Sequence, residues 1–406
     1  MSFRISLSGM NAANSDLNVT SNNIANANTT GFKQSRAEFG DVFPVSAYGL
    51  SRNSTGAGVR LNQVAQQFDQ GNVEFTGKAL DLAISGQGFF TLSNQGSAVY
   101  SRAGNFGADR DGFVVNPSGH RLQVYLPNPS GQGFDTGRMS DLQLATGDSP
   151  PRATGDVQLG SNLPADAAAP VVAPFDSTDP SSYNHTTSLT VYDSLGAPHT
   201  QSLYFVKTAN PNEWQVHTEI DGTAVGGPTT LQYSDTGALA APNPGQFTLP
   251  PHDPGNGAAL LELSIDLGES TQYGESFGVS QLVQDGHATG RLTGIEVSAT
   301  GVVSARYTNG VSNALGQVAM TNFANPQGLQ PLGDNGWAES FESGQPRRGA
   351  AGNSEFGMVQ GGALEASNVD LTAQLVNMIT AQRNFQANAQ MISTQDQITQ
   401  TVINIR

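Results

Sequence analysis

Apolar residues recur in steps of seven at both ends of the chain, a spacing that places them along one side of an α-helix. The N-terminal stretch is predicted to be helical from about residue 2 to residue 22. In the C-terminal stretch no Pro or Gly interrupts residues 363–406, and Ser367 with Asp370 fits a capping box at its start. The pattern predicts two amphipathic helices whose narrow apolar sides are formed by Phe3, Leu7, Met10, Leu17, Ile24, Leu371, Leu375, Met378, Ile379, Phe385, Ala389, Ile392, Ile398, Val402 and Ile405.

Between the two helices the hydrophobic pattern changes to strict alternation, which is typical of half-buried β-strands. Examples are Leu80 to Ile84, Leu122 to Leu126 and Leu261 to Leu267. Turn signals such as Asp111-Gly112 lie between such runs and favour antiparallel pairing. Stretches rich in Pro, Gly, Ala and Ser at residues 127–185 and 221–259 suggest that one β block is inserted in another.

The predicted fold is therefore α+β and multidomain, with terminal helices forming a coiled-coil domain and two mainly antiparallel β domains, one inserted in the other. The expected divisions are an N-terminal helix (1–24), a connecting segment (25–70), a discontinuous β domain (71–145 and 285–361), an inserted outer β domain (146–284) and a C-terminal helix (362–406). Residues 33–70 show little periodicity, so the connecting segment carries no prediction of regular structure.

Charge is unevenly distributed along the chain. The net charge is −16, yet residues 1–40 carry +1 and residues 364–406 carry −1, so the acidity lies between the ends. Such a chain lacks the clustered Lys and Arg that a nucleic-acid partner requires. Near-neutral ends can pack against copies of themselves while an acidic body keeps the protein soluble.

The sequence offers little support for catalysis or metal binding. Cysteine is absent and the six histidines show no pairing at helical spacing, so we expect no metal site and no cofactor. Gly274, Ser276 and Gly278 match a nucleophile-elbow pattern, but the flanks do not resemble a strand followed by a helix. Asp109 and Asp111 resemble the start of a calcium loop whose twelfth position is His120, so we expect a simple turn and no enzyme activity.

Membrane insertion and secretion through a cleaved leader are not expected either. The N-terminal stretch lacks an apolar run of seven or more residues, and no segment is long enough and apolar enough to span a bilayer. A cytosolic protein, or one exported by a route without a cleaved signal peptide, fits this pattern.

The residues alone leave two alternatives for what the terminal helices pack against. The helices can pack on each other or on the β body within one chain, or they can pack on other copies. Burying about ten large apolar residues, at roughly 1.5–3 kcal/mol each, would drive association. The phase of the seven-residue step shifts after Ile392, and there we expect the apolar side to change neighbours.

Several motifs resemble one family. The N-terminal SLSGMNAANSDLNVTSNNIANANTTGFK is similar to the entry segment of bacterial flagellar axial proteins, the rod, hook and hook-associated subunits. GQGFF at 86–90 and YSRAGNFGADRDGFVVNPSGHRLQVY at 100–125 resemble the β segment shared by distal rod and hook subunits, and residues 316–340 and 362–406 resemble hook subunits. Distal rod subunits are shorter, so the insertion at about 146–284 favours the hook.

The resemblance implies a structural subunit that polymerises into the curved tubular hook, a universal joint that transmits motor torque to the filament and encloses the export channel. It implies self-association, with the distal rod, hook cap, hook-associated junction protein and type III export apparatus as further partners. The implied location is extracellular, in the flagellum. Alternative readings are a distal rod protein and a secreted β-rich adhesin that merely ends in helices.

Overall fold

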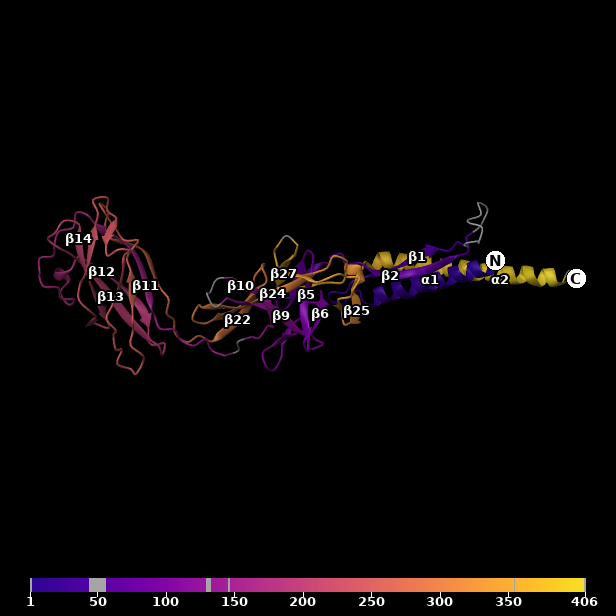
Figure 1. Ribbon diagram of the computed structural model, residues 1–406, viewed down its shortest axis with the longest axis horizontal. Helices are drawn as coiled ribbons and strands as arrows, with labels where there is room; N and C mark the ends of the chain where they lie inside the picture. Colours follow the sequence, from indigo (N-terminus) through magenta and orange to yellow (C-terminus); the bar gives the residue numbers. More distant parts are fainter. Residues whose placement is uncertain (1, 44–55, 129–132, 145–146, 354, 405–406) are drawn as a thin grey trace. The chain divides into compact units, whose positions relative to one another are not determined.

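The computed structural model describes residues 2–43, 56–128, 133–144, 147–353 and 355–404. Its contacts divide the chain into two compact units. The first comprises Met1–Thr146, Gly294–Ala305 and Ser312–Arg406, and the second comprises Gly147–Thr293 and Arg306–Val311. The predicted α+β class is confirmed, because both ends are helical and the chain between them is mainly antiparallel strand (Figure 1).

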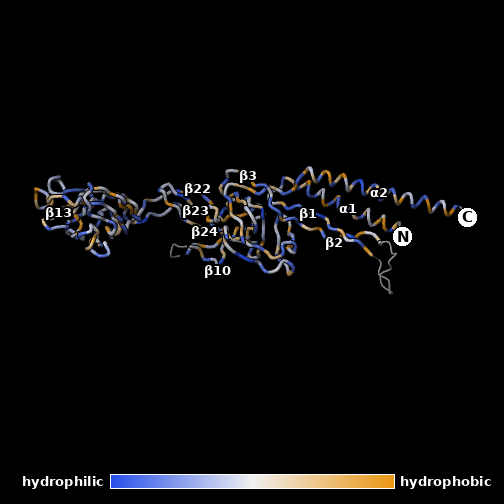
Figure 2. Tube along the Cα trace, turned by 90° about the horizontal axis from the view of Figure 1, so that it is seen from above, coloured by the Kyte–Doolittle hydropathy of each residue, from blue (hydrophilic) through white to orange (hydrophobic). Residues whose placement is uncertain are grey.

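The terminal helices lie side by side in the first unit (Figures 1 and 2). They are α1 (Ser2–Ala25) and α2 (Leu371–Asn404). Asn23 contacts Gln374, and Gly9 lies against Asn388. A step of fourteen residues back along α1 therefore corresponds to a step of fourteen residues forward along α2. The two helices are therefore antiparallel.

The start of α2 differs from the sequence prediction. Residues Ala363–Glu365 form a strand, β29, that pairs with β3 (Val73–Phe75). The helix begins only at Leu371, and Asp370 caps it by accepting hydrogen bonds from the backbone N–H groups of Thr372 and Ala373 at 2.8 and 3.2 Å. The capping-box prediction was therefore wrong in register, since Asp370 is the cap and not the third residue of the first turn.

Regular structure also occurs in the connecting segment, where the sequence predicted none. Strands β1 (Ser35–Asp41) and β2 (Val59–Gln66) form an antiparallel hairpin that packs along α1. A bulge between Glu38 and Phe39 shifts the register of the pair. Because a bulge breaks the alternation of faces, the segment lacks the period-two pattern that identifies a strand.

The β body of the first unit is built around one large sheet. Among its twelve described strands β9 and β24 each pair with four others, and buried residues such as Phe90 and Leu122 form its core. Its strands are β5 (Phe89–Asn94), β6 (Ser97–Ser101), β7 (Gly107–Ala108), β8 (Val114–Val115), β9 (Arg121–Pro127), β10 (Phe134–Asp141), β22 (Leu292–Val297), β23 (Val302–Tyr307), β24 (Ser312–Asn322), β25 (Gln330–Gly333), β26 (Gly336–Ala338) and β27 (Arg347–Ala350). A short sheet pairs β4 (Leu82–Ser85) with β28 (Met358–Gly361).

The second unit packs two sheets around its own core, in which Trp214 and Phe205 are fully buried. One sheet is antiparallel and contains β12 (His185–Tyr192), β13 (Pro198–Lys207), β14 (Glu213–Ile220), β15 (Thr223–Ala224), β16 (Thr229–Tyr233) and β17 (Leu239–Ala241). The other contains β11 (Asp156–Pro164), β18 (Gln246–Thr248), β19 (Ser264–Asp266), β20 (Thr271–Tyr273) and β21 (Gly278–Gln284). In this sheet β11 pairs parallel with β19 and β20 and antiparallel with β21.

Candidate functional site

The buried side chains of α1 and α2 are small or polar. Ser6, Ala13 and Thr20 are buried on α1, each seven residues after the last, and Gln374 and Ala381 are buried on α2 at the same step. A Cβ on Gly9 would lie 2.6 Å from the Oδ1 atom of Asn388, so a larger residue there would have to displace the Asn388 side chain. The helix pair thus buries small and polar residues at a seven-residue step, and its two helices meet at Asn23–Gln374 and at Gly9–Asn388.

Many of the larger apolar residues predicted to form the apolar sides of the two helices are exposed to solvent. Seven of the predicted residues are more than a third exposed: Phe3 (51%), Leu7 (37%), Leu371 (46%), Leu375 (50%), Ile379 (50%), Ile398 (52%) and Val402 (63%). Another seven are half-buried: Met10, Leu17, Ile24, Met378, Phe385, Ala389 and Ile392. Ile405 lies outside the described residues. The pair thus presents an apolar surface, called here the terminal helix surface and defined by the fourteen described residues just given.

Helix α2 extends past the end of α1. The antiparallel pairing that joins Asn23 to Gln374 and Gly9 to Asn388 brings the first residue of α1 opposite about residue 395. Beyond that position α1 offers no partner, and Ile398, Val402 and Ile403 are 52%, 63% and 66% exposed. The hydropathy colouring of Figure 2 shows apolar positions recurring along α2 up to this overhang.

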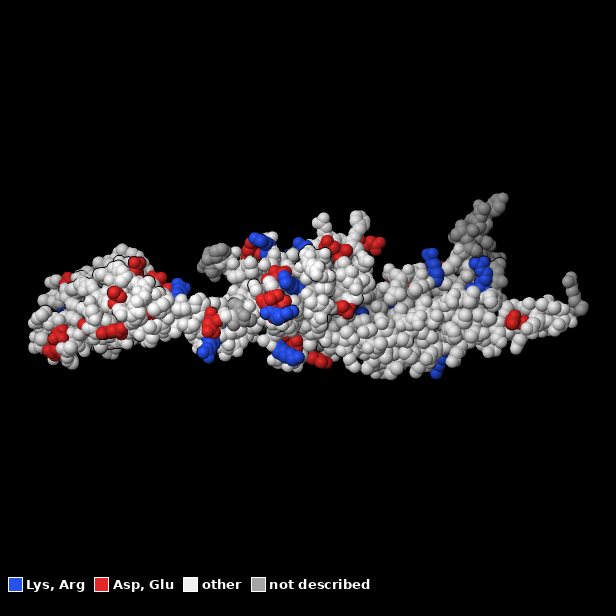
Figure 3. All heavy atoms as spheres, turned by 90° about the horizontal axis from the view of Figure 1, so that it is seen from below, with Lys and Arg blue, Asp and Glu red and all other residues white. Residues whose placement is uncertain are grey.

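The helices carry few charges. The described residues of α1 contain Arg4 and Asp16, and those of α2 contain Arg383 and Asp396. The face of the molecule in Figure 3 shows charged atoms scattered over the β units and sparse over the helices. An apolar surface with few charges is covered at little electrostatic cost, since few ions lose their water.

A buried group of charges lies where the helices meet the β body. Lys33 follows α1, Glu365 precedes α2, and Arg102 follows β6. Lys33 Nζ lies 2.6 Å from Glu365 Oε1, and Arg102 Nη1 lies 3.2 Å from Glu365 Oε2. The side chains of Lys33 and Glu365 are fully buried and that of Arg102 is 4% exposed. We call this group the base triad.

Backbone groups complete the base triad. Lys33 Nζ donates to the carbonyl of Asp69 at 2.7 Å, and Arg102 Nη2 donates to that of Gly86 at 2.8 Å. Glu365 accepts a further hydrogen bond from the N–H of Gly71 at 2.9 Å. Four separate segments therefore meet at one carboxylate, and its charge-assisted hydrogen bonds fix the direction in which both helices leave the body.

Burial shapes the electrostatics of the triad. Burial lowers the pKa of Lys33, and the neighbouring Glu365 carboxylate partly offsets this effect. The pKa of Arg102 is lowered by burial too, again opposed by Glu365. The carboxylate thus offsets part of the cost of removing these two cations from water.

A ladder of amides extends from the triad onto the helices. Asn23 exchanges two hydrogen bonds with the backbone of Ser35, at 2.7 and 2.9 Å, and also contacts Gln374 at 3.3 Å. Asn368 accepts from the N–H of Gln34 at 2.8 Å and donates to backbone carbonyls of the segment before β3. The abundant Asn and Gln of the ends therefore serve as specific links between α1, the hairpin and α2.

Sequence reasoning missed both features. The small residues at positions 6, 13 and 20 share the step of seven that was recognised only among large apolar residues. Lys33 and Glu365 are separated by 332 positions, so no local pattern connects them. The one signal of the ion pair in the sequence was that each is among the few charged residues of a near-neutral end. Charge counting noted these residues without indicating that they are buried.

The chemical motifs singled out in the sequence adopt ordinary conformations. Ser276 is exposed in the loop between β20 and β21, with strands on both sides and no helix following. Asp109 accepts hydrogen bonds from the N–H groups of Asp111 and Phe113 at 2.9 and 2.8 Å, which is the geometry of a turn. Among the described residues no group of three or more His, Asp or Glu is placed to hold a metal ion.

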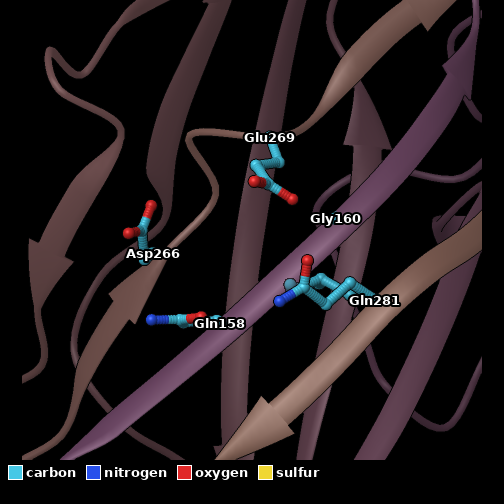
Figure 4. Close-up of a pocket in the computed structure, with 6 residues that line it drawn as sticks. Gln158, Gly160, Asp266, Glu269 and Gln281 are labelled. Carbon is cyan, nitrogen blue, oxygen red and sulfur yellow. The ribbon is translucent and has the colours of Figure 1, made fainter. Parts of the chain in front are cut away.

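A hollow of about 170 Å³ on the second unit has polar walls (Figure 4). Two carboxylates, Asp266 and Glu269, face the amides Gln158 and Gln281 across it. Asp266 is already engaged by Gln246 and by the N–H of Gly268. The hollow therefore brings together hydrogen-bonding groups rather than a nucleophile and a base.

No helix in the described part of the chain is sufficiently long and apolar to cross a lipid bilayer.

Four flagellar families match successive parts of the chain. Residues 3–33 match the family described as flagella basal body rod protein, and residues 83–162 match the flagellar hook protein FlgE/F/G D1 domain. Residues 162–287 match the flagellar basal body protein FlaE D2 domain. Residues 360–405 match the flagellar basal body rod FlgEFG protein C-terminal family.

Curated relatives match over the whole length. The flagellar hook protein FlgE of Salmonella typhimurium is 39% identical over 424 aligned residues, covering 100% of both chains. That of Escherichia coli is 38% identical with the same coverage, and that of Borreliella burgdorferi is 32% identical over 98% of both chains. The crystal structure of the Helicobacter pylori flagellar hook protein FlgE2 has a similar fold, with a TM-score of 0.55 at 15% identity over 72% of this chain and 100% of that one. By its full-length identity to these relatives, the chain belongs to the flagellar hook protein family.

Proposed function

We propose that this chain is the structural subunit of the flagellar hook and polymerises with copies of itself through the terminal helix surface. The observation that carries this proposal is the exposure of large apolar residues on both helices, among them Phe3, Leu375 and Val402. Small residues already satisfy the contact within the chain, so the large residues are left for other copies. Membership in the hook protein family agrees with this function.

The energetics favour assembly over a lone helix pair. Burying one fully exposed large apolar side chain is worth about 1.5–3 kcal/mol, so a side chain that is about half exposed gains roughly half of this on contact. Seven of the predicted residues are more than a third exposed, so a neighbouring copy has much apolar area to cover. The overhang of α2 after residue 395 would contact only other copies, and the change in apolar phase after Ile392 falls just before it.

The division of the chain fits a joint that bends while it transmits torque. In a bent rotating tube each row of subunits must shorten on the inside and lengthen outside. Continuous apolar helices would keep the inner wall intact, while the polar, acidic β units slide at low cost. We propose that residues 71–145 and 285–361 form one discontinuous β domain and residues 146–284 the inserted outer β domain.

The base triad couples the β body of the first unit to both terminal helices. Because Glu365 holds Lys33 and Arg102 together, motion of the β body would be passed directly to both helices. We further propose four partners besides the chain itself: the distal rod, the hook cap, the hook-associated junction protein and the type III export apparatus. We also propose that the protein is located outside the cell, which it reaches through that apparatus.

Electron microscopy of the purified chain tests the function. On concentration or salting-out the full chain should form tubes of uniform diameter. A variant ending at residue 395 loses only the part of α2 that has no α1 partner, so it should remain folded by circular dichroism and form no tubes. Tubes from the truncated variant would contradict the assigned role of the overhang. Monomers that bind a glycan surface and never form tubes would favour an adhesin.

A further inference from the structure

We propose that Asn256 is a site of self-modification in the second unit, where its side-chain amide becomes a carboxylate through a cyclic imide formed with the backbone nitrogen of Gly257. The inference concerns the second unit alone and is independent of the polymerisation proposed above.

The backbone after Asn256 is open to this reaction. The attacking atom is the backbone nitrogen of the next residue, and Gly257 carries no Cβ to hinder its approach. An added Cβ on Gly257 would meet nothing within 4 Å, and among the described residues its N–H has no hydrogen-bond acceptor. Asn256 is exposed, so the water that opens the imide has access to it.

The turn at Asn256 prepares its side-chain carbonyl for attack. Oδ1 of Asn256 accepts a hydrogen bond from the N–H of Ala258 at 3.0 Å. This Asx turn folds the side chain back toward the Gly257 nitrogen. The Ala258 N–H also faces the oxygen on which negative charge develops during attack, as the donors of an oxyanion hole do.

A chain of titratable groups meets the leaving nitrogen. Nδ2 of Asn256 donates to Oδ2 of Asp193, and the same oxygen lies 3.3 Å from Nε2 of His199. Nδ1 of His199 lies 2.6 Å from Asp221. Burial lowers the pKa of His199, but the hydrogen bonds to the two carboxylates outweigh this effect and raise the pKa overall. Protonated His199 can thus supply, through Asp193, the proton that the leaving nitrogen needs.

The reaction balances with water as its only co-reactant. The Gly257 nitrogen loses its proton to solvent and bonds to Cγ of Asn256. The bond from Cγ to Nδ2 breaks, and the side-chain nitrogen takes a proton from the His199–Asp193 chain and leaves as ammonia. Water then opens the imide at either carbonyl, which yields aspartate or isoaspartate at position 256, and solvent reprotonates His199.

The product places a new negative charge beside Asp193. The hydrogen bond from Nδ2 is lost and two carboxylates face each other, which is unfavourable. The segment 253–259 is also tied to the preceding turn by a hydrogen bond from the N–H of Ala259 to Ser194 Oγ at 2.9 Å. We expect the modification to loosen this segment from the rest of the second unit.

A second Asn-Gly pair provides an internal control. Asn309 precedes Gly310, but the Gly310 N–H donates to the carbonyl of Tyr307 at 3.1 Å, so the attacking nitrogen is engaged. Its Nδ2 donates to the carbonyl of Ala288 at 2.8 Å and lies 3.3 Å from Nδ1 of His287, and neither contact brings a carboxylate. The geometry therefore favours reaction at Asn256 over Asn309.

Peptide mapping by mass spectrometry tests the proposal on the full chain incubated at neutral pH. In the folded protein Asn256 should convert about tenfold or more faster than Asn309, because only Asn256 has an acid at its leaving nitrogen. In concentrated urea the two sites should convert at similar rates, since both are Asn-Gly pairs. Equal rates in the folded protein would overturn the proposal, as would a product at position 256 without isoaspartate, which an isoaspartate-specific methyltransferase detects.

Two variants separate the steps. G257A should suppress conversion at Asn256 and leave Asn309 unchanged, whereas the matched control G310A should leave Asn256 unchanged. H199Q, checked for folding by circular dichroism, should slow conversion at Asn256 about tenfold without affecting Asn309. An unchanged rate in G257A would overturn the cyclic imide, and an unchanged rate in H199Q would overturn the proton chain. The comparison of folded and urea-unfolded protein needs no variant, so it decides the proposal even if a variant fails to fold.

Discussion

The terminal helices and the second unit handle their large apolar residues in opposite ways. In the second unit Trp214 and Phe205 are fully buried, so the unit satisfies its own hydrophobic surface. In the helix pair the buried residues are small or polar, whereas Phe3 and Val402 are more than half exposed. A region that buries Ser6 and Ala13 while exposing its large residues is incomplete alone. The contrast separates a part built to fold from a part built to assemble.

The largest expected effect on folding comes from the core of the second unit. Trp214→Ala should lower the free energy of unfolding of the second unit by about 3–5 kcal/mol, because it leaves a large cavity in a core that cannot fully collapse. Urea denaturation followed by circular dichroism measures the loss. Trp214→Phe should retain most of the stability, and equal stability of the Ala variant would show that this core is not closed.

The base triad should respond nearly as strongly. Glu365→Gln leaves Lys33 and Arg102 buried without their anion and should cost about 3 kcal/mol or more of unfolding free energy in the first unit. The pKa of Lys33, already lowered by burial, should fall further in this variant. A cation whose folded pKa lies below its unfolded value gains stability as pH rises from the first value to the second, so the variant should recover in alkali.

The double variant Lys33→Met with Glu365→Gln is the control for this prediction. It removes one of the two uncompensated cations, so it should be more stable than Glu365→Gln alone at neutral pH. If both variants unfolded at the same urea concentration, the cost of Glu365→Gln would have another source than buried charge.

A smaller effect is expected from His199 in the second unit. Its Nδ1 lies 2.6 Å from Asp221 and its Nε2 3.3 Å from Asp193. Burial lowers its pKa, but the hydrogen bonds to the two carboxylates outweigh this and the pKa is raised overall. The pKa of Asp193 is held at about 2, because hydrogen bonds, first from Asn256, overcome its desolvation.

The sign of the pH dependence follows. A raised histidine pKa stabilises the folded state fully below the ordinary value near 6.5 and loses this as pH rises through the folded pKa. The contribution of His199 should therefore be greatest in acidic solution, and about 1.5 kcal/mol, the worth of a charge-assisted hydrogen bond, should be lost as pH rises through its folded pKa. His185 and His217 act in the opposite sense, because burial lowers their pKa values. His199→Gln should flatten this part of the profile, measured as melting temperature against pH. Because His252 also acts on Asp221, the His252→Gln variant is the control that shows its share of the pH dependence.

The smallest effect on folding is expected where the effect on assembly is large. The double variant Ile398→Ser with Val402→Ser alters residues that are 52% and 63% exposed beyond the end of α1. It should change unfolding free energy by under about 0.5 kcal/mol and abolish tubes. Thr399→Ala with Thr401→Ala is the matched control, since those hydroxyls bind only the carbonyls one turn back in the same overhang. Equal tube formation by both variants would break the contrast between the two regions.

Strong periodicity explains what the sequence could predict. The seven-residue step predicted α1 to within a few residues of its observed end at Ala25, and alternation located the strands β4, β9 and β19. Both patterns are local, because each side chain position depends only on neighbours along the chain. The α+β class followed directly from them.

What the sequence could not predict depends on distant residues. Strand β29 interrupts the expected C-terminal helix because Ala363 to Glu365 find a partner in β3, almost three hundred residues away in the chain. The β1–β2 hairpin is obscured by the bulge at Phe39. The assignment of residues to the helix contact also needed the structure, since seven-residue steps of large and of small residues coexist and only packing decides which is inside.

The base triad also sets an order of events in folding. Every chain is made N-terminus first, so Lys33 and Arg102 exist for more than 260 residues of growth before their shared carboxylate arrives. Until then, burying either cation is unfavourable and the segments around them have reason to stay open. The closing contact spans nearly the whole chain, which makes it slow to form and late. The base can therefore be sealed only after Glu365 has been made, 332 positions after Lys33.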